Sequence, residues 1–560
     1  MKQWRLNFIF LLILLFAAAI IGRLIFLQIL NQEYWRALAK GQQMFFAQIT
    51  ADRGEIFLKD KENNLYNLAI NKEWSLVYVA PNEIEEKTKI AEALSQTLDL
   101  DKDPILFKLE KETFYELIKK KLTDQEIQDL KDLNLSGVYL GKEVGRFYPQ
   151  ESLASHVIGF LGGDEQGQYG IEGFYNEILE GKEGFHEGEK SAQGFFLAFS
   201  EKLLPAKKGT DAILTLDYNI QFLTEKLLNE AKENLEAEEG TIIVMDPNSG
   251  KILALASFPS FDPNRYSEVE QFEVFQNGAI QKIYEPGSVF KPIVMAAGLD
   301  QGKITPETTY QDEGFVKIGG YTIYNYDKGV WGQRTITEVL EKSINTGAVF
   351  AEKQVGHQLF LEYIERFGIF EPTGIDLEEE FFSENKEFKK GYEINFATAA
   401  FGQGIGMTAM QLARAFSAIA NGGKLVRPYL VENSPLLSNS FSEDGREVIS
   451  QRTAFQLTSM LVSVVENGFA KGAKVPGYYI AGKTGTAQIS WPALGVDKSG
   501  YSEKTIQTFV GYAPAFDPQF LILIKLNNPK TKTAEYSAVP IFKELAKYII
   551  DYYQIPPDYE

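Results

Sequence analysis

The sequence predicts an α+β fold for its C-terminal part, residues 206–560, and two observations indicate it. Candidate strands stand near both ends of this region, at residues 241–245, 252–256, 505–512 and 520–525, and helical patterns occupy most of the chain between them. Strands drawn from distant segments form an antiparallel sheet with helices on its faces, here joined by an all-helical part.

Local signals justify the individual elements. Asp217 is placed to cap a helix, and the turn Asp246-Pro247-Asn248-Ser249-Gly250-Lys251 joins the first two strands as a hairpin. A second strand pair meets across Asp517-Pro518, and residues 539–553 predict a closing helix. The stripe that the capped helix should bury consists of Ile220, Leu223, Leu227, Ala231 and Leu235.

The amino terminus predicts one membrane helix. Lys2 and Arg5 precede an apolar run over residues 8–21 that resumes at 24–27, which indicates a cytoplasmic tail at 1–6 and a signal-anchor at 7–30. The positive flank should stay in the cytoplasm, so the rest of the chain is expected outside. A cleaved signal peptide is the alternative, but the apolar run continues past the alanines at 17–19.

Residues 31–205 predict a separate domain, which ends at the polar break 205–209. Residues 83–98 and 123–133 are expected to form amphipathic helices in it. Its residues show no metal-ligand spacing, and His156 is interpreted as a hydrogen-bonded structural histidine.

Composition excludes several kinds of chemistry. A formal charge of −20 argues against nucleic acid as a partner. No cysteine is present, and the only histidines are His156, His186 and His357, so a thiolate nucleophile is impossible and a Ser-His-Asp triad would depend on His357. Because no Gly-x-Ser-x-Gly elbow accompanies it, lysine is the remaining candidate for a general base.

Ser288 and Lys291 form the candidate nucleophile and base. A Pro-Gly turn at 286–287 leads into an apolar run, so Ser288 is expected at a helix start, where backbone N–H groups favour negative charge. Lys291 follows one turn later on the same face, within reach of the serine hydroxyl. Ser-x-x-Lys alone is a weak signal, because Ser383 and Lys386 repeat it in a charged stretch that should be solvated surface.

Two companion motifs strengthen the assignment. Ser343 and Asn345 supply a hydroxyl and an amide two residues apart, a pattern that a capped turn would also produce. Lys483-Thr484-Gly485-Thr486 joins small residues to groups suited to a carboxylate, on a strand along which a peptide could lie closely. All three motifs in this order predict acyl transfer through a serine ester.

With these motifs the chain resembles the class B penicillin-binding proteins, single-span peptidoglycan D,D-transpeptidases. Residues 53–56, 146–149 and 170–173 are similar to boxes of that family's elongated non-catalytic pedestal, a dimerisation-type domain, here 31–205. Residues 401–404 and 421–423 resemble a further box of its penicillin-binding transpeptidase domain, here 206–560. Ala409-Met410 and the end of the Arg53 box depart from the usual pattern, without touching catalytic groups.

The resemblance implies a mechanism without metal or organic cofactor. Ser288 would attack the D-Ala-D-Ala end of a stem peptide while Lys291 takes its proton, and Ser343 with Lys483 would protonate the leaving amine. Asn345 would hold the donor amide. The family pattern further implies that Thr484 and Thr486 bind the terminal carboxylate, that Gly485 lets the donor lie close, and that the backbone N–H groups of Ser288 and Thr486 form the oxyanion hole.

The resemblance also implies partners and leaves rivals open. β-Lactams should acylate Ser288, and a membrane-embedded glycosyltransferase should supply the glycan, since residues 31–205 leave no room for such a domain. A β-lactamase or D,D-carboxypeptidase would use the same groups with water as acceptor, but no Glu-x-x-Leu-Asn element follows the serine motif, and the one at Glu225 to Asn229 lies before it. A β-lactam sensor would need more membrane helices, and a pseudoenzyme would not need intact Ser288, Lys291 and Lys483.

Overall fold

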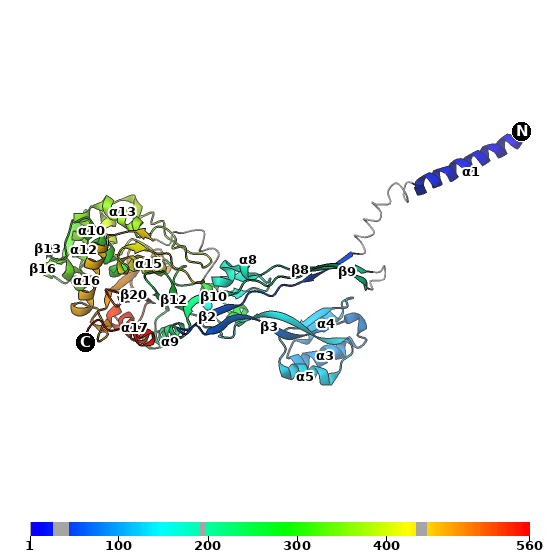
Figure 1. Cartoon of the computed structure of the whole chain (residues 1–560), viewed down its shortest axis with the longest axis horizontal. Helices are drawn as coiled ribbons and strands as arrows, with labels where there is room; N and C mark the ends of the chain where they lie inside the picture. The colour runs from blue at the N-terminus through cyan, green and yellow to red at the C-terminus, as the bar shows by residue number, and fades with distance from the viewer. Residues whose placement is uncertain (1, 26–43, 191–195, 433–444) are drawn as a thin grey trace. The chain divides into compact units, whose positions relative to one another are not determined.

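The computed structural model describes residues 2–25, 44–190, 196–432 and 445–560 (Figure 1). Its contacts divide the chain into two compact units. One comprises residues 1–54 and 177–210, and the other comprises residues 55–176 and 211–560. All three motifs lie in the second unit.

The first unit contains a helix and a small sheet. Helix α1 spans Lys2–Ile25, and strands β1 (Met44–Ile49), β8 (Gly184–Lys190) and β9 (Phe196–Leu204) form an antiparallel sheet in the order β1-β8-β9. Within the described ranges, no helix reaches the combination of length and apolar character that a bilayer crossing requires. Residues 26–30 of the predicted anchor lie outside the described residues.

The N-terminal part of the second unit is a five-stranded sheet with three helices. Strands β2 (Ile56–Lys59), β3 (Leu65–Val79), β4 (Glu116–Lys119) and β10 (Ala212–Asp217) run in the order β10-β2-β3-β4, and β5 (Val138–Phe147) also pairs with β3. Helices α3 (Lys87–Leu98), α4 (Lys102–Leu109) and α5 (Asp124–Leu133) share one apolar core with β3.

The helix predicted at 123–133 is confirmed, because Thr123 and Glu126 form a reciprocal capping box at its start. The helix predicted at 83–98 begins later, at Lys87. Ile84 is extended and buried in the core instead, so burial of its side chain overrides the helical pattern there.

A buried ion pair joins two of the predicted boxes. Arg146 Nε donates to Glu172 Oε1 at 2.7 Å, from the end of β5 to the short helix α7 (Gly170–Phe174). His156 lies in α6 (Ser155–Ile158), fully enclosed, with Nε2 2.9 Å from the Val274 carbonyl oxygen, and burial lowers its pKa to about 4. Its environment is that of a structural histidine.

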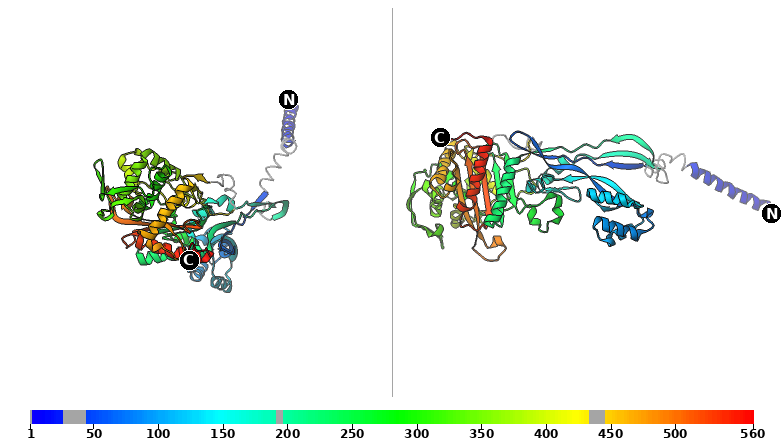
Figure 2. Two further views of the ribbon diagram at one scale, coloured as in Figure 1. Left: turned by 60° about the vertical axis from the view of Figure 1, so that its left-hand side comes forward. Right: turned by 90° about the horizontal axis from the view of Figure 1, so that it is seen from below.

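The C-terminal part is built on an antiparallel sheet in the order β12-β11-β21-β20-β19. Its strands are β11 (Glu239–Met245), β12 (Ile252–Phe258), β19 (Ala481–Ser490), β20 (Tyr501–Ala513) and β21 (Phe520–Asn527). Helices α9 (Tyr218–Leu235) and α17 (Ala538–Tyr553) cover one face, as Figure 2 shows from below. The predicted hairpin, strand pair, Asp217 cap and closing helix are confirmed.

Helices α15 (Ala409–Ala420) and α16 (Gln451–Asn467) contact the same sheet, and α16 also contacts α10 (Lys291–Asp300), whose residues are almost all buried. The part predicted to be all-helical is mainly helical but also contains short strands. Its further helices are α11 (Ile336–Glu341), α12 (Asn345–Val355), α13 (His357–Arg366) and α14 (Glu393–Ala399), and its strands are β13 (Thr309–Asp312), β14 (Phe315–Ile318), β15 (Tyr321–Tyr324) and β16 (Gly332–Thr335).

Candidate active site

Ser288 lies on a tight 3₁₀ turn, η5 (Gly287–Phe290), that leads directly into α10. Gly287 has φ +64°, and a Cβ there would lie 2.9 Å from the Ala487 Cβ, so the turn needs glycine at this position. Its N–H donates to the Gly402 carbonyl oxygen at 3.0 Å. The box at 401–404 thereby fixes the turn that carries Ser288.

Lys291 is fully buried at the start of α10. Its Nζ donates to the Ser343 carbonyl oxygen at 2.5 Å, to Ser343 Oγ at 3.2 Å and to Asn345 Oδ1 at 2.9 Å. Within the described ranges, the Ser288 hydroxyl forms no hydrogen bond with this amine. Since catalytic hydrogen bonds often form only when substrate binds, one helical turn between the two residues keeps the predicted transfer within reach.

Ser343 lies in the short link between α11 and α12, and Asn345 begins α12. Ser343 has φ +53°, an unusual conformation for a residue with a side chain, and its carbonyl oxygen and its hydroxyl both meet Lys291. Asn345 is the first residue of α12, and its Nδ2 donates to the Tyr324 carbonyl oxygen at 3.1 Å. The amide is therefore held at both ends.

Lys483 reaches the same point from β19, an edge strand of the sheet. It is fully buried, and its Nζ donates to Ser343 Oγ at 3.1 Å and to the Thr484 carbonyl oxygen at 3.0 Å. The Ser343 hydroxyl thus contacts the amines of both lysines. Residues from three segments, far apart in sequence, converge on one hydroxyl group.

Burial decides the protonation of this cluster. It lowers the pKa of Lys291 well below the ordinary value, and the positive charge of Lys483 lowers it further. Burial lowers the pKa of Lys483 to about 7. Desolvation is thus the larger cause for Lys291, and the Lys483 charge comes second. With a pKa of about 7, Lys483 can take up and release a proton near neutral pH, and the lowered pKa of Lys291 favours its neutral amine.

Gly485 lets the edge strand approach the serine turn. A Cβ there would lie 2.9 Å from the Pro286 carbonyl oxygen and 3.1 Å from the Val289 nitrogen. Because side chains alternate along a strand, Lys483 and Gly485 lie on one face of β19, and Thr484 and Thr486 lie on the other face along the same open edge. The Thr486 hydroxyl accepts the Ala534 N–H at 3.2 Å, and the Thr484 side chain is nearly buried.

A buried network that no sequence motif indicated supports the site. Asp312 is 1% exposed, and its carboxylate accepts hydrogen bonds from the Thr346 hydroxyl, at 2.5 Å, and from Asn325 Nδ2. Asn325 Oδ1 accepts the Thr346 N–H at 3.1 Å. The network directly follows both partners of the Asn345 contact. Asn325 is the residue after Tyr324, and Thr346 is the residue after Asn345.

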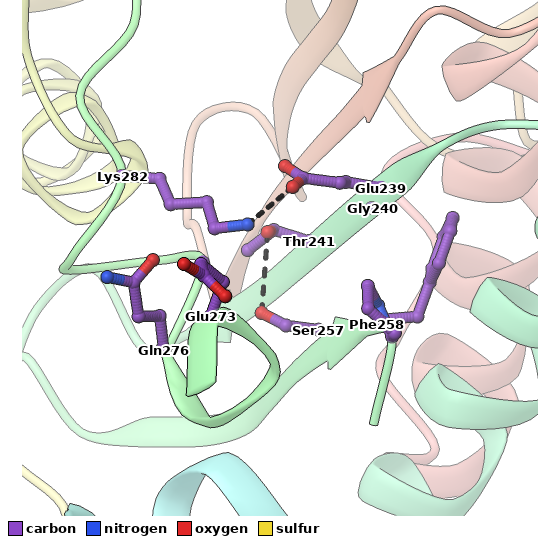
Figure 3. A pocket seen from close by; sticks show the side chains of 10 residues that line it. Glu239, Gly240, Thr241, Ser257, Phe258, Glu273, Gln276 and Lys282 are labelled. Carbon is purple, nitrogen blue, oxygen red and sulfur yellow. Dashed lines mark hydrogen bonds and ion pairs between the residues drawn. The ribbon is translucent and has the colours of Figure 1, made fainter. Parts of the chain in front are cut away.

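Two other places that could be considered as sites lie away from the three motifs. The second Ser-x-x-Lys sequence is at the surface, as expected, where the Lys386 side chain is 82% exposed and pairs with Glu384 at 2.9 Å. Figure 3 shows a polar cavity of about 10 Å³ beside β11, where Lys282 pairs with Glu239 at 2.5 Å and Thr241 Oγ1 lies 3.4 Å from Ser257 Oγ. This volume suits about one water molecule, so it admits no substrate.

Where the chain is described, no three of its His, Asp or Glu side chains gather in a way that could hold a metal ion. The groups that the site offers for chemistry are the serine, the two lysines and the polar groups around them. A serine on a helix-start turn, two buried amines and an open strand edge define a serine acyltransferase site.

Comparison with known proteins agrees with this class. The family model of the penicillin-binding protein transpeptidase domain matches residues 240–547, and that of the penicillin-binding protein dimerisation domain matches residues 48–214. Stage V sporulation protein D of Bacillus subtilis is 32% identical over 94% of this chain and 82% of its own length. The probable peptidoglycan D,D-transpeptidase PbpC of Pseudomonas aeruginosa is 30% identical over 100% of this chain and 97% of its own length.

Among solved structures, a peptidoglycan synthetase from Bifidobacterium adolescentis shares the fold with a TM-score of 0.71 at 24% identity, covering 92% of this chain and 98% of its own. The chain belongs to the penicillin-binding proteins, and its dimerisation and transpeptidase domains place it in their class B. The family prediction is thereby confirmed, as is the α+β transpeptidase fold with an N-terminal dimerisation domain, whereas the membrane helix stays a prediction.

Proposed function

We propose that this chain cross-links peptidoglycan stem peptides as a serine D,D-transpeptidase whose acyl-enzyme forms on Ser288. The observation that carries the proposal is the double contact of the Ser343 hydroxyl with Lys291 Nζ, at 3.2 Å, and Lys483 Nζ, at 3.1 Å, beside the serine turn. It supplies both a base and a route for the proton to the leaving group.

In acylation, each proton that one group gives up is taken by another group of the site or of the donor. The Ser288 proton passes to the lone pair of Lys291, whose neutral amine has two N–H groups and so keeps two of its three hydrogen bonds, while Oγ bonds to the carbonyl carbon of the penultimate D-alanine of the donor stem. The bond to the terminal D-alanine breaks, and its amine takes a proton from Lys483 through Ser343. Attack by an amine of a second stem reverses these transfers and releases Ser288. Low pKa values for both lysines, caused by burial, support this division of roles.

The donor is held by Asn345 and by the edge strand. Asn345 already directs its Oδ1 to Lys291 and its Nδ2 to a carbonyl oxygen, so a peptide amide could replace the Tyr324 contact. Thr486 accepts a backbone N–H, which leaves its own hydroxyl proton available to a carboxylate. Thr484 would bind the same carboxylate, and Gly485 would let the donor lie close to β19. The N–H groups of Ser288 and Thr486 would bind the oxyanion.

β-Lactams fit the same site because they carry a strained acyl group and a carboxylate in place of the D-Ala-D-Ala end. Ring opening on Ser288 forms an ester whose departing nitrogen stays tethered, so the leaving group continues to shield the ester. The chain is therefore expected to trap β-lactams and to release them slowly.

The test uses the full chain with a synthetic stem pentapeptide and an added amine acceptor. We expect D-alanine release together with the amide product, and loss of both in Ser288→Ala. Glu384→Gln, in the surface repeat of the motif, serves as the matched control. Release of D-alanine with hydrolysed tetrapeptide as the sole product would assign a carboxypeptidase instead.

Location and partners are part of the proposal. The positive flank at Lys2 and Arg5 and the apolar run after it support a single-span anchor, with the catalytic domain outside the cytoplasm. A membrane-embedded glycosyltransferase would then supply the glycan that this chain cross-links. Extraction of the chain from membranes by carbonate at high pH would contradict the anchor, and failure to recover a polymerase in mild detergent would contradict the partner.

A further inference from the structure

The hairpin of β14 and β15 presents an aromatic face to solvent. Phe315 pairs with Tyr324 and Lys317 pairs with Thr322, so these four side chains lie on one side of the ribbon. Phe315 is 40% exposed and Tyr324 is 48% exposed, and their ring centroids are 6.3 Å apart. We call these four side chains, with Lys328, whose Nζ lies 5.4 Å from the centre of the Tyr324 ring, the aromatic face.

Packing inside the protein does not account for this face. The opposite side of the same ribbon is apolar and provides the core contacts, through Ile318 and Ile323, which pack with Val349 and Phe401. Neighbouring aromatic side chains left in solvent beside a site are a common mark of a binding surface. Each exposed ring also has a lysine amine near it, since Lys317 Nζ lies 5.9 Å from the centre of the Phe315 ring.

The hairpin is joined to the catalytic residues. The Tyr324 carbonyl oxygen accepts from Asn345 Nδ2 at 3.1 Å, and Asn345 Oδ1 accepts from Lys291 Nζ at 2.9 Å. The next residue, Asn325, is anchored by the buried carboxylate of Asp312. Because the Asp312 anchor persists when a donor amide replaces the Tyr324 contact, the aromatic face keeps a fixed position relative to Asn345.

We propose that the aromatic face binds the sugar rings of the glycan strand that carries the donor stem, an inference that rests on the proposed function. The C–H groups of a pyranose ring form a flat apolar surface that stacks on aromatic rings, while its hydroxyl groups can accept from Lys317 and Lys328. Four stem residues separate the sugar from the reacting carbonyl and span at most about 14 Å. A donor held at Asn345 keeps its glycan within that distance of Ser288.

The test compares two donors on the full chain in detergent. One is a glycan strand that bears pentapeptide stems, and the other is the same pentapeptide without sugar. In Phe315→Ala with Lys317→Ala, we expect KM for the glycan-bearing donor to rise at least about tenfold more than KM for the free peptide. Phe272→Ala, which removes an exposed ring elsewhere in the domain, is the matched control and should leave the ratio of the two KM values unchanged.

Two results would overturn the inference. An equal rise in both KM values would mean that the hairpin acts through Asn345 alone, and two KM values equal to those of the unaltered protein would mean that no sugar binds there. Labelling by a fluorescent penicillin separates this inference from the proposed function, because an unaltered protein that fails to label contradicts the proposed function whatever the glycan result.

Discussion

Replacement of Asp312 by asparagine should weaken both the fold around the site and the reaction. The Asp312 carboxylate accepts from the Thr346 hydroxyl at 2.5 Å, from the Trp331 N–H at 2.7 Å and, with both oxygens, from Asn325 Nδ2 at 3.0 Å. Asparagine keeps one acceptor oxygen and places an NH₂ group where the other oxygen stood. At least one of the buried groups that donated to Asp312 then faces the new NH₂ group, which is itself a donor.

The magnitude follows from these contacts. A hydrogen bond to a charged group contributes about 1.5–3 kcal/mol, and an unsatisfied buried donor costs about 1–3 kcal/mol, so we expect the free energy of unfolding to fall by about 2–4 kcal/mol. Asn325 and Thr346 flank the amide contact of Asn345. A displacement of Asn345 by an ångström would slow acylation about 100-fold.

Stopped-flow acylation by a fluorescent penicillin measures the rate, and urea unfolding of the same samples measures stability. Glu313→Gln alters an exposed neighbour of Asp312 and should change neither quantity. Acylation of the fully folded Asp312→Asn protein at the normal rate would refute the role of this network in positioning Asn345.

Two further predictions concern the lysine cluster and the strand approach. Because Lys483 has a pKa of about 7 in the folded chain and 10.5 ordinarily, the unfolded chain binds more protons between these values, so stability should rise with pH across that window. Lys483→Met should flatten this rise in urea titrations, and an unchanged slope would contradict the shift. Gly485→Ala forces a Cβ to 2.9 Å from the Pro286 carbonyl oxygen and should slow penicillin acylation about tenfold or more, whereas Gly163→Ala, with only an ordinary 3.6 Å contact, should not.

Local signals predicted the elements well. The Asp217 carboxylate accepts from the backbone N–H groups of Asn219 and Ile220 as an N-cap should, and the turn after Met245 forms the expected hairpin. These features depend on neighbours in sequence. Ile84 was assigned wrongly to a helix because its burial against distant residues could not be read from its own segment.

The motifs also indicated which side chains would share a site, but not their contacts. Lys291 was expected to meet Ser288, whereas its amine donates to Ser343 and Asn345, because the left-handed conformation of Ser343 turns a carbonyl oxygen into the site. The sequence did not indicate Asp312, because no local sequence pattern marks a carboxylate that becomes buried. Its partners, Asn325 and Thr346, come from separate turns of the chain that only the tertiary fold brings together.

The position of a covalent penicillin adduct tests the central claim most directly. The full chain, incubated with benzylpenicillin, digested and analysed by mass spectrometry, should carry one penicilloyl group on the hydroxyl of Ser288, and the adduct should persist for many minutes. A penicilloyl group on another side chain, or an intact Ser288 peptide after complete reaction, would contradict the account.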